Sequence, residues 1–193
     1  MSDPSQQTPL HPYWEPEKAA LLLRLPALLP VETPIHSPAA TLRIVLATPA
    51  ESPLVLSITQ AAFAEYEGLL DPPNTAAAET VADVHHAMTE GGNLLAWVGT
   101  DAVASARFRF TPDHLYVGRL AVLPEQRGRG IASALMHAME AIARATGRPE
   151  IALGTRMHLT RNIALYAKLG YKITKTHQHP RGKDIIAWLS KQV

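Results

Sequence analysis

A strand that passes through a glycine-containing turn directly into a long amphipathic helix restricts the fold of this chain more than any other feature. The composition of residues 115–123 predicts a buried strand, and that of residues 124–130 predicts a polar turn. Residues 131–146 follow without a break and carry apolar side chains at helical spacing, namely Ile131, Leu135, Ala138, Met139 and Ile142. A strand followed at once by a helix predicts a layered α/β fold.

The rest of the pattern predicts a mixed sheet flanked by helices. Strands are expected at 42–47, 93–100, 102–110, 115–123, 150–154, 171–177 and 184–189. Helices are expected at 53–66, 75–90, 131–146 and 161–169. Consecutive strands that are joined by tight turns pair antiparallel. The predicted fold class is therefore α/β with a mixed, mostly antiparallel central sheet.

The turn before the long helix has the chemistry of an anion site. The first turn of a helix has unpaired N–H groups and a partial positive charge. Gly128 and Gly130 leave the backbone open to a ligand, and Arg127 and Arg129 add cations. The turn therefore predicts a pyrophosphate site; the alternative is a plain helix start with a charged lead-in. The spacing fits neither a dinucleotide-binding fingerprint nor a Walker A loop.

Two motifs in this order resemble the signatures of the GNAT acetyltransferase superfamily. Arg127, Gly130 and Ala132 match the pattern [Q/R]-x-x-G-x-[G/A]. Further along the chain, residues 162–171 resemble the N-x-x-x-Y-x-K-L-G-F/Y element. With the strand order, the resemblance covers roughly residues 42–190. It implies the mixed, mostly antiparallel sheet of these enzymes and acetyl-CoA as the co-substrate.

The resemblance also implies roles for individual residues. The coenzyme pyrophosphate would lie on backbone N–H groups of the turn, and the pantetheine arm would pair with the preceding strand, where an N–H near Val122 would hold the acetyl carbonyl. Asn162 would contact the coenzyme arm, although it is also placed to cap the following helix. Tyr166 would return a proton to the leaving thiolate, although a buried aromatic in the core is the alternative. The implied coenzyme-binding residues are Leu120, Ala121, Val122, Arg127, Gly128, Arg129, Gly130, Ile131, Ala132 and Asn162.

The acceptor side departs from the family pattern. Gly118 stands where many members carry a glutamate that deprotonates the amine, so the general base is left open. The candidates for a base from outside this strand are Tyr66, Glu67, Asp71 and Glu79. Asp71 and Glu79 could instead bind a cationic acceptor as counter-ions. The alternatives are a turn residue for Asp71 and a solvated helix face for Glu79.

Composition excludes several other classes of protein. Eighteen basic and seventeen acidic side chains give a net charge of +1, which leaves no excess of cations for coating a nucleic acid. The chain has no cysteine, so disulfides, thiolate metal sites and a catalytic thiol are excluded. The histidine pairs at 85–86 and 177/179 lack a third ligand, and no metal site is expected. No apolar run is long enough to span a bilayer, so a cytoplasmic protein is expected.

The N-terminal region is predicted to be a separate extension. Ten of the sixteen prolines lie in the first 53 residues, and proline disfavours long regular elements. We therefore assign residues 1–40 to an extension and residues 41–193 to the acetyltransferase domain. The extension is too apolar for a solvated tail. Its aromatic and leucine side chains are expected to dock on the domain or on a second subunit, which would make a homodimer.

These observations predict an enzyme that moves an acetyl group from acetyl-CoA to a primary amine by direct attack in a ternary complex. The amine is expected to be a small molecule or a peptide. Two alternatives remain on the same fold. One is an acyl-CoA-binding sensor with little or no turnover, which Gly118 favours. The other is an interaction module that assembles through the N-terminal arm.

Overall fold

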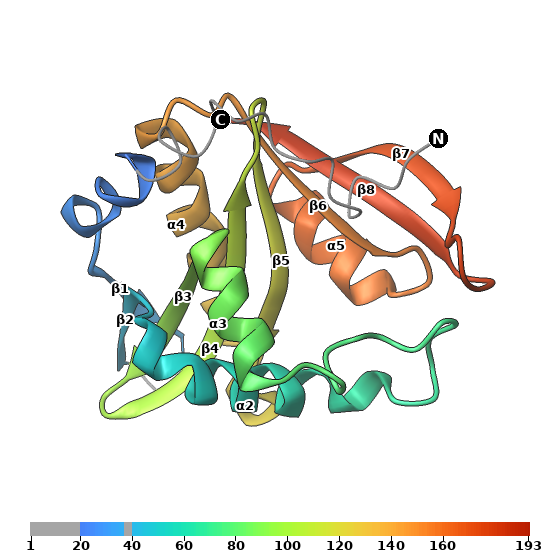
Figure 1. Cartoon of the computed structure of the whole chain (residues 1–193), viewed down its shortest axis with the longest axis horizontal. Coiled ribbons are helices and arrows are strands. Elements are labelled where there is room, and N and C mark those ends of the chain that lie inside the picture. Colours follow the sequence, from blue (N-terminus) through green and yellow to red (C-terminus); the bar gives the residue numbers. More distant parts are fainter. Residues whose placement is uncertain (1–19, 37–39) are drawn as a thin grey trace.

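The computed structural model describes residues 20–36 and 40–193, and these form an open eight-stranded sheet with helices on both faces (Figure 1). The strand order across the sheet is β1-β2-β3-β4-β5-β6-β8-β7. The strands are β1 (Val31–Ile35), β2 (Ala40–Leu46), β3 (Gly91–Val98), β4 (Asp101–Phe110), β5 (Leu115–Val122), β6 (Glu150–Arg156), β7 (Lys172–Gln178) and β8 (Ile185–Gln192). Every neighbouring pair is antiparallel except β5 and β6, which are parallel. The predicted mixed, mostly antiparallel sheet is confirmed.

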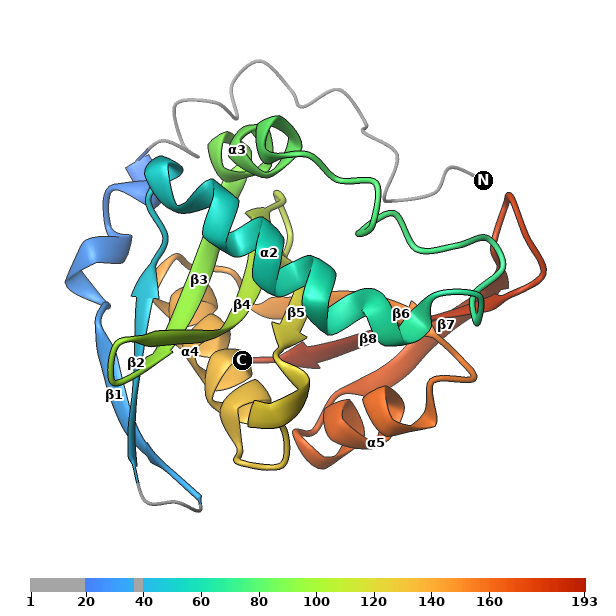
Figure 2. The same cartoon turned by 90° about the horizontal axis from the view of Figure 1, so that it is seen from below.

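The helices divide between the two faces of the sheet. Figure 2 shows α2 and α3 on one side of the strands and α4 and α5 on the other. The α helices are α2 (Ser52–Phe63), α3 (Val81–Thr89), α4 (Ile131–Ala145) and α5 (Thr160–Lys168). Short 3₁₀ helices occur at η1 (Leu25–Ala27), η2 (Pro49–Glu51), η3 (Ala64–Tyr66) and η4 (Pro124–Gln126). All five apolar residues that predicted the long helix are buried in the core under α4.

The second helix on the α2 side begins later than its sequence predicts. The pattern favoured a helix from residue 75, but α3 begins at Val81. Thr80 caps it, because its hydroxyl accepts a hydrogen bond from the Asp83 N–H at 3.2 Å while the Asp83 carboxylate accepts one from the Thr80 N–H at 2.8 Å. Residues 75–79, which were expected to be helical, form turns instead.

A β-bulge in β5 opens the sheet at its centre. Ser105 pairs with Ala121 and Arg107 pairs with Gly118, so two residues of β5 lie opposite one residue of β4. Within the bulge, Arg119 has a positive φ of 49°. Such a bulge bends its strand, and the parallel ladder between β5 and β6 ends at the pair Val117–Leu153. Beyond that pair, the two strands diverge and leave an opening beside the start of α4.

Part of the proline-rich N-terminal region belongs to the sheet. β1 pairs with β2 although it contains a proline, which an edge strand tolerates. Leu21 and Leu25 are buried in the core that lies under α4. Most leucines of residues 20–36 thus pack on the domain, which is one of the two expected arrangements, although Leu23 is exposed. Tyr13 and Trp14 lie outside the described residues, and the boundary at residue 40 stays a prediction.

Within residues 20–36 and 40–193, no helix combines the length and the apolar character that crossing a membrane requires.

Candidate active site

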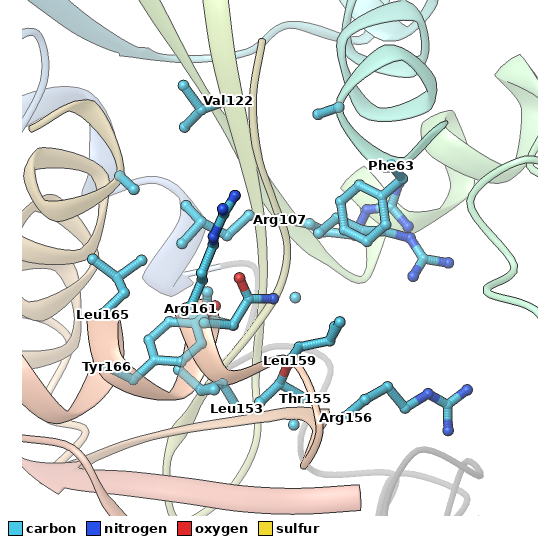
Figure 3. Close-up of a pocket in the computed structure, with 18 of the residues that line it drawn as sticks. Phe63, Arg107, Val122, Leu153, Thr155, Arg156, Leu159, Arg161, Leu165 and Tyr166 are labelled. Atoms are coloured by element: carbon cyan, nitrogen blue, oxygen red, sulfur yellow. The ribbon is translucent and has the colours of Figure 1, made fainter. Parts of the chain in front are cut away.

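The opening between β5 and β6 continues into a cavity of about 1730 Å³. Its walls come from β4, β5, β6, α5, the start of α4 and the segment between α2 and α3. Figure 3 shows Val122, Leu165 and Tyr166 at one part of this pocket and Phe63, Arg107 and Arg156 around another. The two motifs that are far apart in the sequence therefore meet at one site.

The turn before α4 exposes its backbone to this cavity. Gly130 is the N-cap of α4 with a φ of 85°, and no side chain caps the helix there. Gly128 has a φ of 76°, and a β-carbon placed on it would have no heavy atom within 4 Å. Both conformations favour glycine, and the space at Gly128 lets a ligand approach the backbone. The geometry fits a pyrophosphate group at the helix N-terminus.

The side chain of Arg127 is engaged elsewhere. Its Nε donates to the Val122 carbonyl at 3.1 Å, and its Nη2 donates to the Ala62 carbonyl at 3.0 Å. Its Nη1 lies 2.7 Å from the Glu65 carboxylate. The sequence analysis expected this guanidinium to add positive charge for the phosphates. In the structure, it ties the turn to the C-terminal end of α2 instead.

The second arginine of the turn contacts the end of β1. The Arg129 Nε donates to the His36 carbonyl at 3.4 Å, and the His36 N–H donates to the Arg129 carbonyl at 3.3 Å. The Arg129 guanidinium also bonds the Gln126 side chain. The imidazole of His36 lies 3.7 Å from the place of a β-carbon on Gly130. The N-terminal region thus reaches the anion site, which no local sequence signal indicated.

The end of β5 offers a donor to the opening. The Leu123 N–H donates to the Val103 carbonyl on β4 at 3.0 Å. Because N–H groups alternate in direction along a strand, the N–H of Val122 faces the other way, toward the opening. Leu120 and Ala121 precede it along this edge, which no strand of residues 20–36 and 40–193 covers beyond Val117. An amide-bearing arm has room to pair there as an added strand.

Tyr166 lies on α5 and lines the same cavity. It is 8% exposed, and its ring packs edge-on against Tyr171 with 6.1 Å between centroids. Burial raises the pKa of its hydroxyl, and the neighbouring Tyr66 and Tyr116 raise it further. The hydroxyl therefore keeps its proton at neutral pH, as a proton donor requires. Tyr166 belongs both to the core and to the cavity wall, so the two sequence interpretations are compatible.

Asn162 faces the cavity from the first turns of α5. The helix begins at Thr160 and its N-cap is Leu159, so the interpretation of Asn162 as the cap is wrong. Its amide Nδ2 donates to the Tyr66 hydroxyl at 3.4 Å. Burial raises the pKa of that hydroxyl. The pair links α5 to η3 across the pocket.

Glu79 is held by two arginines behind the cavity wall. Its carboxylate accepts hydrogen bonds from Arg107 at 2.9 and 3.3 Å and from Arg119 at 3.0 and 3.1 Å. Burial opposes ionisation of Glu79, but these bonds and charges outweigh it and lower the pKa of the carboxyl. Its oxygens thus already serve two guanidinium groups. The expected role as a counter-ion for a cationic acceptor has no support in this geometry.

Asp71 joins two segments that lie over the cavity. Its carboxylate accepts a hydrogen bond from the Lys183 N–H at 3.1 Å, and its own N–H donates to Asp184 at 3.0 Å. A β-carbon on Gly182 would lie 2.3 Å from the nitrogen of Pro72. The segment after η3 and the β7–β8 hairpin are therefore in tight contact. The geometry gives Asp71 a role in holding these segments together instead of the expected role in binding an acceptor.

Sequence reasoning missed the arginines of the acceptor side. Arg107 and Arg109 alternate on β4 with the buried Phe108 and Phe110. That alternation was a readable signal that both arginines face away from α4. Arg156 continues β6 past the point at which the opening begins. The sequence offered no local signal that it would face the cavity.

Comparisons with known proteins agree with this geometry. Residues 57–171 match the model of the Acetyltransferase (GNAT) family, a span that includes the turn and the 162–171 element. A search of proteins with curated functions found no match.

Many solved structures share the fold. The GNAT domain of S. lividans PAT has a TM-score of 0.67 at 19% sequence identity, covering 85% of this chain and 97% of that one. The ribosomal-protein-S18-alanine N-acetyltransferase of Escherichia coli has a TM-score of 0.65 at 18% identity, covering 79% and 94%. The PaiA N-acetyltransferase of Thermoplasma acidophilum in complex with coenzyme A has a TM-score of 0.68 at 15% identity, covering 79% and 99%. At these identities the similarity establishes the fold.

Proposed function

The chain belongs to the GNAT acetyltransferase family, and we propose that it transfers an acetyl group from acetyl-CoA to a primary amine by direct attack in a ternary complex. One observation carries the proposal: the opening between β5 and β6 lies beside a helix start with glycine-exposed backbone donors. A pyrophosphate and an amide-bearing arm are the two chemical parts that this combination fits.

The turn and the strand edge have separate tasks in this reaction. The backbone of residues 127–132 would hold the pyrophosphate, and the edge at Leu120, Ala121 and Val122 would pair with the arm. Acetyl-CoA supplies an acyl group that is activated as a thioester. The Val122 N–H is directed to stabilise negative charge on the acetyl oxygen as the amine attacks.

Tyr166 would supply the proton that the leaving group needs. Attack forms the C–N bond and breaks the C–S bond, after which the sulfur takes the phenolic proton of Tyr166. The amine loses one proton to water, and water returns one to Tyr166, so the protons balance. The raised pKa of Tyr166 supports this role, because the hydroxyl is protonated before each turnover.

The amine has no adjacent glutamate of the family type. Gly118 pairs with Arg107 across the strands, and a β-carbon on Gly118 would have the Tyr116 ring as its nearest contact at 3.4 Å. Glu79 is a poor base because its arginine partners lower its pKa. We therefore propose that the space at Gly118 holds the water that accepts the proton of the amine. Gly118 is also what favours the second candidate, an acyl-CoA-binding module with little turnover.

Calorimetric titration with acetyl-CoA, followed by an amine screen, tests the proposal. We expect micromolar affinity, and release of the coenzyme thiol when an accepted amine is added. A thiol reagent reports that release without background from the protein, because the chain has no cysteine. Binding without turnover on any amine would favour the acyl-CoA-binding module.

Gly128→Val tests the anion site itself. The variant should weaken acetyl-CoA binding by about 100-fold, or roughly 2.7 kcal/mol, because a branched side chain would fill the space above the turn. Gly99→Val is the matched control: Gly99 also has a positive φ, of 59°, and open space, but it lies in the β3–β4 turn away from the cavity. Equal losses in both variants would contradict the assignment of the turn.

A further inference from the structure

The acceptor end of the cavity presents arginines, and their acidic partners lie behind them. Arg107 and Arg119 line the cavity, whereas Glu79, which pairs with both, does not. Arg156 also lines it, whereas its partner Asp184, at 3.5 Å, does not. An acceptor beside these three arginines would therefore meet their guanidinium groups before the carboxylates that pair with them.

Several buried polar atoms at this end have no hydrogen-bond partner among the described residues. They include the Arg156 Nη1, the Trp188 Nε1 and the His177 Nδ1. The rest of the Arg156 guanidinium is engaged, because Nη2 donates to the Pro72 carbonyl at 3.1 Å and Nε faces Asp184. Burying an N–H without a partner is costly, so the N–H groups of Arg156 and Trp188 would be stabilised by a ligand that accepts hydrogen bonds.

Strand pairing places these groups on one face of the sheet. Tyr116 pairs with Ala152 on β6, so Gly154 and Arg156 share its face. Gly154 pairs with Trp188, whose ring lies 3.6 Å from the place of a β-carbon on Gly154. The His177 ring is stacked on Trp188 at 6.3 Å. This is also the face of Gly118, where the attacking amine would lie.

The cavity is covered at this end. The residues after η3 and the β7–β8 hairpin both line it, and hydrogen bonds between Asp71 and residues 183–184 join them. Arg156 holds the same cover through the Pro72 carbonyl. A covered space suits a small acceptor better than a side chain on the surface of a folded protein.

We propose that the acceptor is a small amine that carries a carboxylate, and that this carboxylate accepts hydrogen bonds from Arg156 and Trp188. The inference rests on the proposed acetyl transfer and identifies the class of its acceptor. A carboxylate accepts several charge-assisted hydrogen bonds, which suits the unpartnered Arg156 Nη1 and Trp188 Nε1 on one face of the sheet. A cationic acceptor would face the guanidinium groups of Arg107, Arg119 and Arg156, because the carboxylates that pair with them do not line the cavity. The stacked aromatic rings offer apolar surface to the body of the acceptor.

Matched pairs of amines test the inference. Glycine, β-alanine, γ-aminobutyrate and L-phenylalanine would each be compared with the amine that lacks the carboxylate, and phosphoethanolamine would stand for a phosphate group. Thiol release gives kcat/KM, and calorimetry on the protein saturated with CoA gives affinity without turnover. We expect at least one carboxylate to be preferred over its partner by roughly 10- to 100-fold, the range for a hydrogen bond to a charged group.

Two variants identify the residues. Arg156→Gln should reduce that preference toward unity, mainly by raising KM for the amine that carries the carboxylate. Because Arg156 also supports the cover, Trp188→Phe is the second variant: it removes one N–H that has no partner inside the described chain and keeps an aromatic ring. Arg144→Gln, an exposed position outside the cavity lining, is the control and should change nothing.

The outcomes separate this inference from the proposed function. Failure of acetyl-CoA to bind would remove both. If acetyl-CoA binds, three results would overturn the inference alone: decarboxylated amines that react equally well, a preference for phosphoethanolamine, or no carboxylate that binds or reacts. A preference that both variants leave unchanged would overturn the assignment to Arg156 and Trp188.

Discussion

The contacts of Arg127 lead to a prediction that opposes its sequence interpretation. Its guanidinium bonds two carbonyls, of Val122 and Ala62, and the carboxylate of Glu65. If these contacts are its main task, Arg127→Met should destabilise the fold. Methionine keeps the apolar stem of the side chain but donates no hydrogen bond.

The expected loss follows from these three contacts. Each hydrogen bond from the charged guanidinium to a partly buried carbonyl contributes about 1.5 kcal/mol, the lower end of the range for charged donors. The ion pair with Glu65 adds only about 0–0.5 kcal/mol, because its two side chains are 36% and 38% exposed. The free energy of unfolding should therefore fall by about 3 kcal/mol. With an m-value of about 2 kcal/mol/M, the urea midpoint should move down by about 1.5 M.

Urea unfolding of the protein without coenzyme measures this effect, and Arg144→Met serves as the exposed control. Titration with acetyl-CoA on the folded variant should show a small change in affinity compared with Gly128→Val. An unchanged urea midpoint together with a large, salt-dependent loss of affinity would refute the reasoning. That result would place the guanidinium on the phosphates in solution.

The other predictions concern Tyr166 and Glu79. Tyr166→Phe should lower kcat by about 100-fold and leave the Kd of acetyl-CoA within about twofold; equal losses in stopped-flow rates and in affinity would indicate a packing role. Glu79→Gln should lower the free energy of unfolding at pH 7 by about 2–3 kcal/mol, since two arginines lose their anion. Because the folded state lowers the Glu79 pKa below its ordinary 4.5, this stabilisation is present above that pH and is lost as the pH falls through the folded value. Urea unfolding at pH 7 and near pH 3 measures this effect. The difference in free energy of unfolding between wild type and variant should be smaller near pH 3 than at pH 7.

Local sequence patterns predicted those features of the fold and of the site that depend on a single helix or turn. The spacing of Ile131 to Ile142 predicted the buried face of α4, and the glycines of the turn predicted its exposed backbone. The motifs placed Tyr166 and the anion turn in one site, and the structure brings both to one cavity. Such features depend on residues that are close in sequence.

Roles that depend on distant partners were not predictable. Glu79 is bound by arginines that lie 28 and 40 positions away, and Asp71 by a backbone N–H that lies 112 positions away. The sequence alone does not distinguish either carboxylate from a solvent-exposed one, because these partners are distant along the chain. β1 was missed for a related reason: its five residues contain a proline, and only pairing with β2 makes them a strand.

The short parallel ladder between β5 and β6 has a mechanical consequence. Three paired positions, from Leu115–Ile151 to Val117–Leu153, are all the backbone pairing that joins strands β1–β5 to strands β6–β8 in the described sheet. Separating the sheet at this boundary would therefore break fewer backbone hydrogen bonds than at any other pair of neighbouring strands. A pantetheine arm paired with the edge of β5 would add hydrogen bonds at this boundary between β5 and β6. The apparent free energy of unfolding would then rise with the coenzyme concentration, by mass action. In this protein the co-substrate would also stabilise the folded sheet.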